Sequence, residues 1–537
     1  MRRIRCIASA ILALCMTVSL FGCAPNAEQK TEAAPAVLNG AWDGEPTSMD
    51  ILKYSGVVDL KLIWNLQEPL VRIENGQVVA AGAEKWDVSE DGLTYTFTLR
   101  DSKWSDGVKV TSTDYLNLLK RQATPENMFA YASDFYGIKN FEAVNLGELP
   151  VEQLGVSTPD ENTLVIELEY PNNTFLSSIE IYPEREDIVS QYAEDYGYSP
   201  ETMVYSGPFK MTKWEHNSSI VLEKNETYWN SENVKLDQVN LQIITDGATK
   251  LTSFQAGTID YVSCSDENYI KMFRESDEMY EEHAQSARTY MFLFNCKDSL
   301  MQNEKIRQAM ALSINREEIC TVLDNGLTTP AYGLIPPSTA VGKYDYRTEV
   351  EEPLLELSKN NPDPKILFAD GLKELGITET LDSVTITLSC PNDSTSQENA
   401  EYYKAMWEEN LGIKININMQ EFATYRSLIW SDEYQIATTA WGGSIEPYFL
   451  LSRWMPDNQS QWDNNEYAEI VENGSKEIND QERLSLYASA EKILISDDAA
   501  IAPIKYDGYS VFYYNYVQGN DNNPFSNVGF KSMYITK

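Results

Sequence analysis

Residues 68–116 read EPLVRIENGQVVAAGAEKWDVSEDGLTYTFTLRDSKWSDGVKVTSTDYL. Within them, the segment LTYTFTLR (93–100) alternates large apolar side chains with threonines. Because successive side chains of a β-strand point to opposite faces, the apolar set falls on one face and the threonines fall on the other. The apolar set is Leu93, Tyr95, Phe97 and Leu99. This alternation predicts a half-buried strand that packs its apolar face against a hydrophobic core.

Strand and helix patterns are interleaved along the rest of the chain. Further strands are predicted at LVIEL (164–168), VNLQII (239–244), VTITL (384–388) and IKININM (413–419). Helices are predicted at 303–314, 315–323, 398–412 and 481–494. Gly412 would end the third of these helices, and Asn315 with Glu318 forms a capping arrangement at the start of the second. Interleaved elements of this kind favour α/β domains that contain mixed sheets.

The chain has 537 residues, which exceeds the size of one hydrophobic core, so two or more domains are expected. Its first 22 residues have a different character. Arg2, Arg3 and Arg5 form a basic head, and the apolar segment behind it is too short to span a bilayer comfortably. Residues 1–22 are therefore predicted to be a secretory signal peptide.

The end of this leader carries a possible attachment site. Leu20-Phe21-Gly22-Cys23 resembles a bacterial lipobox, in which the cysteine is lipidated; the alternative is an ordinary signal peptide with a chance cysteine. Residues 23–35 are rich in Ala, Glu and Pro, as is typical of a flexible tether. We therefore expect an exported protein that is lipid-anchored through Cys23 at the outer face of the bacterial cell membrane, or that is periplasmic.

The formal charge of −40 makes nucleic acid an unexpected partner, because a phosphate backbone requires a basic surface. The acidity is better explained by solubility and mutual repulsion. Four cysteines remain after Cys23, and whether they form disulfides or are small buried hydrophobic residues stays open. They are Cys264, Cys296, Cys320 and Cys390. With only two histidines in the chain and no C-x-x-C spacing, no metal site is expected.

Catalytic motifs are missing from the sequence. It contains no G-x-S-x-G elbow, H-E-x-x-H, P-loop or G-x-G-x-x-G motif. Two histidines provide little material for a nucleophile–histidine relay. Carboxylates are abundant enough to supply a glycosidase pair anywhere, so their presence does not discriminate. We therefore expect neither an enzyme nor a protein that uses a cofactor.

Several ordered motifs resemble one known family. Residues 68–116 are similar to the early region of the peptide-binding proteins of ABC importers, and SGPFKMTKWEHNSSIVLEKNETYWN (206–230) is similar to a later one. The segments SFQAGTIDYV (253–262), FNCKDSLMQNEKIRQAMALSINREEI (294–319) and AYGLIPPS (331–338) follow in the family's order. On these motifs the chain is identified as a lipid-anchored member of the oligopeptide- and dipeptide-binding family.

The resemblance implies an α/β, two-lobed, hinged fold of the periplasmic-binding-protein type with an additional α+β domain. Lobe I would be split into 36–68, 200–288 and 505–537, the additional domain would be 69–199, and lobe II would be 289–504. The family captures peptides in a cleft between lobes, closes around them and docks on the permease subunits of an importer. We expect a monomer that contacts the membrane only through its lipid anchor.

The resemblance also implies site residues. Ala440, Trp441 and Gly442 align with a segment that pairs with the main chain of an extended ligand, and Gly44, Glu45 and Pro46 align with a second such segment. The further candidates are Tyr131, Ser263, Cys264, Arg288, Phe422 and Tyr506. Arg288 would meet a ligand carboxylate or form an interdomain ion pair. Trp441, Phe422 and Tyr506 would line the cleft or belong to a core.

The sequence departs from the family pattern beside Trp441. Peptide binders commonly carry an aspartate there that pairs with the α-amine of the ligand, whereas this chain has Gly443 and Ser444. Glu446 is the only carboxylate between Trp441 and Pro447, so we predict that it replaces the aspartate. The alternative is a Glu446 that caps the following helix or faces solvent.

Two other functions fit the same fold. One is a receptor for a non-peptide solute such as an oligosaccharide, because aromatic rings also stack on sugars. The other is a sensor that reports a peptide signal to a membrane partner.

Overall fold

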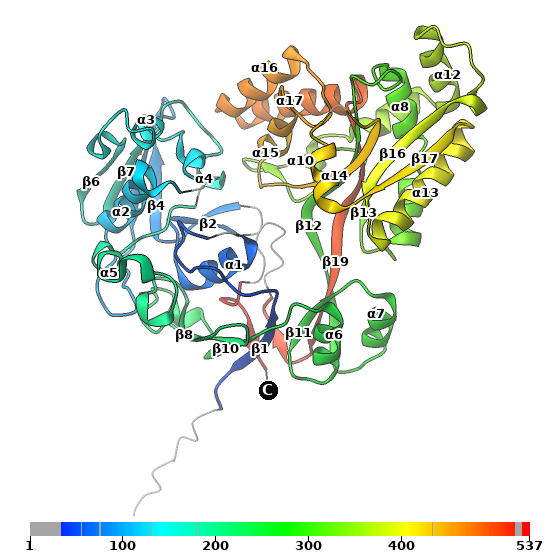
Figure 1. Cartoon of the computed structure of the whole chain (residues 1–537). Coiled ribbons are helices and arrows are strands. Elements are labelled where there is room, and N and C mark those ends of the chain that lie inside the picture. The colour runs from blue at the N-terminus through cyan, green and yellow to red at the C-terminus, as the bar shows by residue number, and fades with distance from the viewer. Residues whose placement is uncertain are drawn as a thin grey trace, which may run out of the picture. The chain divides into compact units, whose positions relative to one another are not determined.

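The computed structural model describes residues 34–536 except 55, 75, 76, 130, 179, 432 and 521–528. The predicted leader and lipobox, Cys23 and most of the predicted tether therefore lie outside the described residues. From Ala36 onward the chain forms one compact unit. Its elements are shown in Figure 1.

The first sheet combines a strand from the start of the chain with three strands from the middle. Its order is β1-β10-β9-β8, with β1 parallel to β10 and the other neighbours antiparallel. The strands are β1 Val37–Trp42, β8 Phe209–Glu215, β9 Ser219–Lys224 and β10 Gln238–Ile243. Alternate residues such as Ile220, Leu222 and Val239 are fully buried, so one face of the sheet lies on the core. Helix α1 Val57–Leu66 buries Leu62 in the same core.

The second sheet is antiparallel and contains the strand predicted first. Its order is β4-β5-β7-β6, and its strands are β4 Ala83–Val88, β5 Thr94–Leu99, β6 Val156–Asp160 and β7 Thr163–Glu167. Tyr95, Phe97 and Leu99 are buried as the alternation predicted. The helices of this region are α2 Ser112–Ala123, α3 Phe141–Asn145, α4 Phe175–Ser178 and α5 Glu186–Tyr192.

The third sheet has seven strands and mixed directions. The order is β11-β19-β12-β18-β16-β17, and β13 also pairs with β19. The strands are β11 Tyr261–Cys264, β12 Met279–Phe294, β13 Thr329–Pro330, β16 Thr385–Pro391, β17 Lys414–Gln420, β18 Ile436–Gly442 and β19 Ile501–Tyr514. β16 is parallel to both β17 and β18. This sheet therefore contains the predicted strands at 384–388 and 413–419.

Helices cover the third sheet and agree with the predicted positions. Helix α13 Ser394–Leu411 packs on β16 and β17 and buries Tyr403, Trp407 and Leu411. Gly412 follows in the left-handed conformation (φ 75°) and ends the helix as predicted. The Asn315 side chain accepts a hydrogen bond from the Glu318 N–H, so the predicted cap is present.

The other helices of this half are α6 Gly247–Gln255, α7 Glu267–Arg274, α8 Glu304–Leu312, α9 Arg316–Glu318, α10 Tyr346–Glu349, α11 Pro353–Asn360, α12 Pro364–Glu374, α14 Phe422–Leu428, α15 Tyr448–Leu451, α16 Asn465–Lys476 and α17 Asp480–Lys492. Short strand pairs complete the fold. They are β2 Val71–Glu74 with β3 Gln77–Ala80, β14 Ala340–Val341 with β15 Tyr344–Asp345, and β20 Val517–Gln518 with β21 Tyr534–Ile535.

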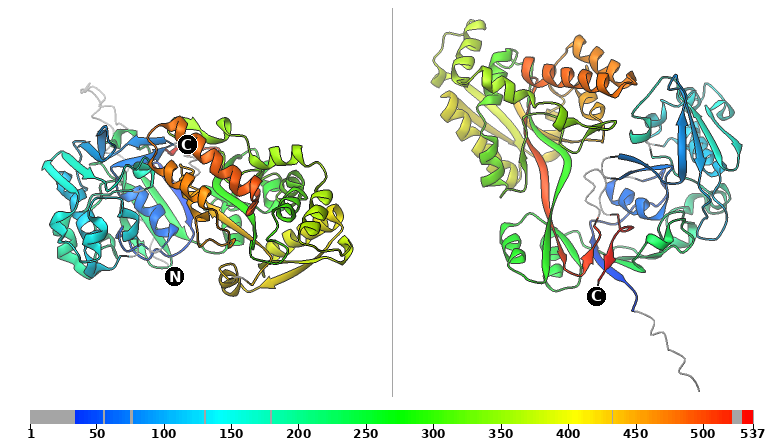
Figure 2. Two further views of the ribbon diagram at one scale, coloured as in Figure 1. Left: turned by 90° about the horizontal axis from the view of Figure 1, so that it is seen from above. Right: turned by 180° about the vertical axis from the view of Figure 1, so that it is seen from behind.

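Two long strands, β12 and β19, run side by side from β11 to the part of the sheet that holds β16–β18 (Figures 1 and 2). Residues 279–285 pair with 508–514, and residues 289–293 pair with 501–506, with register shifts between Gln285 and Thr289 and between Tyr290 and Met291. A shift of this kind interrupts the ladder and bends the strands locally. It lies beside the predicted lobe boundaries at 288/289 and 504/505.

The described residues form three hydrophobic cores. One extends from Leu38 to Leu241 and includes residues near the C-terminus, one extends from Met291 to Ile504, and a small one lies under α6 and α7. The predicted lobe I and additional domain share the first core. The domain boundaries themselves stay predictions.

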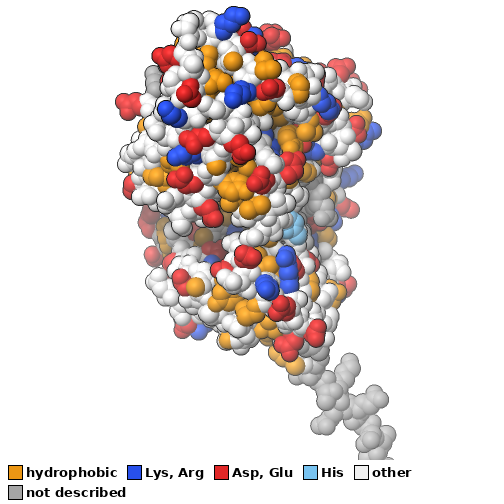
Figure 3. Space-filling view, turned by 90° about the vertical axis from the view of Figure 1, so that its right-hand side faces the viewer, with side chains coloured by type: hydrophobic (Ala, Val, Ile, Leu, Met, Phe, Trp, Pro, Cys, Tyr) orange, Lys and Arg blue, Asp and Glu red, His pale blue; other side chains and the backbone are white. Residues whose placement is uncertain are grey.

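The described surface and cysteines bear on the expected partners. In the face shown in Figure 3, acidic side chains are scattered among fewer basic ones. Among the residues that the structure describes, no helix is long and apolar enough to cross a bilayer, and no cluster of His, Cys, Asp or Glu could hold a metal ion. The four described cysteines are free, and three of them are buried.

Candidate ligand-binding site

The end of strand β18 has an open backbone edge. On one side it pairs with β12 along its whole length, with Tyr290 opposite Ala440 and Arg288 opposite Gly442. On the other side it pairs with β16 only through Ile436 and Ala437. The Tyr425 hydroxyl then contacts both the N–H and the carbonyl oxygen of Thr438. Residues 439–442 have no neighbouring strand on that side in the described part of the chain.

Side chains hold this open edge in place. The Trp441 indole N–H donates to the side-chain oxygen of Gln459 at 3.2 Å. The Arg453 guanidinium lies 4.9 Å from the Trp441 ring centroid and 4.5 Å from that of Phe449, which are cation–π distances. These contacts fix the orientation of the indole while its ring stays partly exposed.

Arg288 lies beside the same edge. It is exposed, and its guanidinium is 5.2 Å from the ring centroid of Tyr290 on the same strand. Burial raises the pKa of Asp507, and the positive charge of Arg288 opposes this rise. The structure therefore brings Arg288 close to residues 440–442, and its role toward a ligand carboxylate stays a prediction.

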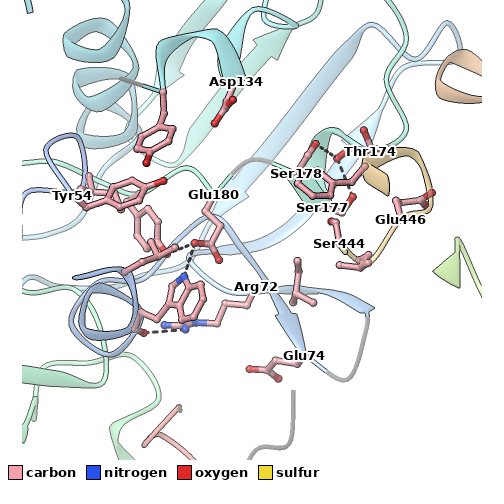
Figure 4. A pocket seen from close by; sticks show the side chains of 18 of the residues that line it. Tyr54, Arg72, Glu74, Asp134, Thr174, Ser177, Ser178, Glu180, Ser444 and Glu446 are labelled. Atoms are coloured by element: carbon pink, nitrogen blue, oxygen red, sulfur yellow. Dashed lines mark hydrogen bonds between the residues drawn. The ribbon is translucent and has the colours of Figure 1, made fainter. Parts of the chain in front are cut away.

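A cavity of ≈ 820 Å³ begins immediately after this strand. It is lined by α1 and β2, by the segment 172–182, by the loop 443–449 and by residues near the C-terminus. Tyr131 and Glu446 are the predicted site residues that line it, and Gly443 and Ser444 line it as well. Figure 4 shows the labelled side chains around it.

Most charged side chains of the cavity have partners of opposite charge. Arg72 forms an ion pair with Glu68, and it also donates to the carbonyl oxygens of Trp64 and Gln67. Lys531 pairs with Glu74 at 2.8 Å. These pairs neutralise the wall formed by β2 and the C-terminal segment.

Glu446 is also paired. Its carboxylate lies 3.4 Å from Arg483 of α17, and the residue is only 7% exposed. It is therefore neither a helix cap nor a solvent-facing residue, which were the alternatives to an amine-binding role. Burial raises its pKa to about 7, while Arg483 and the backbone N–H of Gly342 oppose the rise. The amine-binding role stays a prediction, and a ligand amine would compete with Arg483 for this carboxylate.

Glu180 and Asp134 differ from these residues. One oxygen of Glu180 accepts hydrogen bonds from the Trp64 indole N–H at 2.7 Å and from the Tyr182 hydroxyl at 2.5 Å. Burial raises the pKa of Glu180, and the two hydrogen bonds and Arg72 oppose this rise. Burial also raises the pKa of Asp134, which Arg453 opposes. Both carboxylates lie on the wall of the cavity.

Three predicted site residues use their side chains elsewhere. The Glu45 carboxylate accepts from the Trp214 indole and the Asn217 N–H and contacts His216, so it fixes the β8–β9 turn. The Cys264 thiol is buried in the small core under α7, so it is not part of an exposed cleft wall.

The third of these residues is Tyr506. It is buried, and its hydroxyl donates to Glu352 at 2.6 Å and lies 3.0 Å from the Gly333 carbonyl oxygen. The burial of its ring and its hydroxyl favours the core alternative for Tyr506, and a lining role toward a ligand stays a prediction.

The remaining candidates lie outside the cavity. Gly44 and Pro46 follow β1, Ser263 is exposed on β11, and Phe422 is 64% exposed at the start of α14. Their roles toward a ligand stay predictions.

The cavity wall formed by Tyr54, Trp64 and Glu180 was not predicted from the sequence. Tyr54 stacks on Tyr131, with ring centroids 4.8 Å apart and planes 11° from parallel. The residues of this wall come from segments more than one hundred positions apart, so no local pattern could join them. The one usable signal was SSIEIYP (177–183), in which an acidic residue interrupts an apolar strand-like segment.

Comparisons with known proteins agree with this architecture. A family model described as bacterial extracellular solute-binding proteins, family 5 Middle, matches residues 77–462. The oligopeptide-binding protein OppA of Bacillus subtilis (strain 168) is 29% identical over 498 residues, which cover 90% of each chain.

Solved structures match nearly the whole chain. The periplasmic murein tripeptide binding protein MppA in its unliganded open form has a TM-score of 0.81 and 25% identity, covering 94% of this chain and 98% of that chain. Listeria monocytogenes OppA bound to peptide has a TM-score of 0.69 and 26% identity, covering 94% and 100%.

The predicted two-lobed α/β fold is confirmed by these structures, and the prediction that the chain is not an enzyme is confirmed by its family. Because the family model covers more than half of the chain, this protein belongs to the bacterial extracellular solute-binding proteins of family 5.

Proposed function

We propose that this protein captures short peptides outside the cytoplasm and delivers them to the permease subunits of an ABC importer. The observation that carries the proposal is the open edge of residues 439–442 on β18. An extended peptide that lies along this edge would add a strand to the sheet and pair with its main chain. Main-chain pairing supplies affinity that is largely independent of the peptide sequence.

The cavity beside this edge would receive a side chain or an end of the peptide. It follows directly from the strand through Gly443 and Ser444, and Gly443 donates its N–H to the carbonyl oxygen of Ala287. The volume of ≈ 820 Å³ is within the range of small-molecule sites. A peptide could therefore pair with β18 and place one group inside the cavity.

Closure and anchoring complete the proposal. The register shifts between β12 and β19 lie beside the predicted lobe boundaries, which supports a hinge at this crossing. Cys23 is the proposed lipid anchor, and the tether would let a monomeric receptor reach its permease. The Bacillus subtilis relative named as an oligopeptide-binding protein supports the peptide assignment.

The test begins with the ligand itself. Protein purified from its host and denatured should release short peptides that mass spectrometry identifies. Released oligosaccharides would instead favour the non-peptide receptor, and a single defined peptide would favour the sensor.

Calorimetry with tetraalanine tests the pairing. Moving one N-methyl group along the peptide should reduce affinity at least about tenfold at one or more positions, because the methyl group removes a ladder hydrogen bond. Equal affinity for all the methylated peptides would contradict main-chain pairing.

A further inference from the structure

Two carboxylates of the cavity have no cation of their own. Within the described residues, no Lys, Arg or His lies within ion-pair distance of Glu180 or Asp134. The nearest guanidinium groups are already engaged, since Arg72 pairs with Glu68 and Arg453 lies over the rings of Trp441 and Phe449. This end of the cavity therefore carries uncompensated negative charge.

The position of Glu180 is fixed by its surroundings. Its hydrogen bonds from Trp64 and Tyr182 use one carboxylate oxygen, and the other has no donor among the described residues. Figure 4 shows the Glu180 carboxylate with these bonds and Asp134 on the same side of the cavity. Glu180 is half-buried and Asp134 is exposed, so a ligand can reach both of them. A partly desolvated carboxylate is stabilised when a cation or donor meets its free oxygen.

Aromatic rings stand beside these charges. Tyr54 and Tyr131 stack and both line the cavity. Burial raises the pKa of Tyr54 to about 12, with smaller contributions from Tyr131, Asp134 and Glu180, so the phenol stays neutral beside the carboxylates. Neutral ring faces attract a cation, and nearby carboxylates add to that attraction.

We propose that this end of the cavity is a subsite for one cationic group of the ligand, an ammonium or a guanidinium, held by Glu180 and Asp134 against the Tyr54–Tyr131 stack. The proposal rests on the proposed peptide-binding function and adds a preference to it. The cation comes either from the α-amine of the peptide or from a Lys or Arg side chain. In this subsite Glu180 is free to bind a ligand cation, because no arginine forms an ion pair with it within the described residues. Glu446, in contrast, is paired with Arg483.

The probes are alanine tetrapeptides that carry one lysine at each position in turn. A second set has norleucine in place of lysine, and a third set is N-acetylated. In calorimetry on the full mature protein, removing the cation that the subsite binds should lower the affinity of the peptide at least about tenfold. A loss with norleucine identifies a side-chain cation, and a loss with the acetyl group identifies the α-amine.

The variants are Glu180→Gln and Asp134→Asn. Glutamine keeps an acceptor for Trp64 and Tyr182, and the Asp134 side chain makes no hydrogen bond within the described residues, so both variants should fold with unchanged melting temperatures. Glu180→Gln should reduce the preference for the cationic peptide to less than about threefold and leave the affinity for the neutral peptide unchanged. Asp134→Asn should lower the same preference to a smaller extent.

The control is Glu161→Gln, which removes an exposed carboxylate paired with Lys109 outside the cavity. It should leave both affinities unchanged. If wild-type protein binds cationic and neutral peptides equally, or if Glu180→Gln retains the full preference, the subsite does not exist although peptide binding stands. If none of the peptides binds, the proposed function itself fails.

Discussion

Replacing Glu446 with glutamine tests how the structure uses this buried cavity carboxylate. Burial raises the pKa of Glu446 from its ordinary value of 4.5 to about 7. Between these two values the folded protein holds a proton that the unfolded chain has released. Folding therefore takes up a proton, so this group's contribution to stability is complete below pH 4.5 and is lost as the pH rises through about 7.

The magnitude follows from the same values. Each pH unit corresponds to about 1.4 kcal/mol, so the difference between 4.5 and about 7 is about 3 kcal/mol. Glutamine has the same shape and does not titrate. Arg483 retains Asp480 at 2.8 Å and the carbonyl oxygen of Glu477, so the variant does not leave it unpaired.

The assay is urea unfolding of wild type and Glu446→Gln at pH 4.5 and pH 8. The variant should gain stability relative to wild type by about 3 kcal/mol between these pH values. A difference in stability that does not change with pH would refute the reasoning. Peptide affinity separates the two roles of Glu446: a loss of about thirtyfold or more would support its predicted pairing with the ligand amine, and a change of less than about threefold would leave it a structural partner of Arg483.

Two further predictions concern the hinge and the anchor. Small-angle scattering should show a smaller radius of gyration at saturating peptide, because the lobes close about the β12–β19 crossing; an unchanged radius would contradict the hinge. Cys23→Ala should release the protein from membranes and leave peptide affinity unchanged, because the tether is separate from the folded unit that begins at Ala36. Continued membrane association of this variant would contradict a lipid anchor.

Local patterns in the sequence predicted much of the fold. The alternation in 93–100 corresponds to β5, and the spacing in 398–412 corresponds to α13 with its end at Gly412. These features depend on side-chain periodicity and on a left-handed glycine, both of which are encoded within a few residues. The two-lobed fold came from the family resemblance, because no local pattern contains it, and the lobe boundaries stay predictions.

The candidate site could be predicted only in part. Residues 440–442 and Arg288 lie on neighbouring strands. The resemblance implied each of them as a site residue, and their roles toward a ligand stay predictions. The partners of individual side chains could not be predicted, because they come together only when distant segments pack. Glu446 forms an ion pair with Arg483, and Glu45 accepts a hydrogen bond from Trp214. Glu180 was missed for the same reason: its donors are Trp64 and Tyr182, and only folding gathers them at one cavity.

Hydrogen–deuterium exchange at residues 439–442 tests the central claim most directly. These residues form the open edge of β18, so their outward-facing amides exchange freely unless another strand pairs with them. Saturating the protein with its peptide should slow exchange at these amides, while residues 436–437, which already pair with β16, should change little. Unchanged exchange at 439–442 in the saturated protein would contradict capture of a peptide as an added strand.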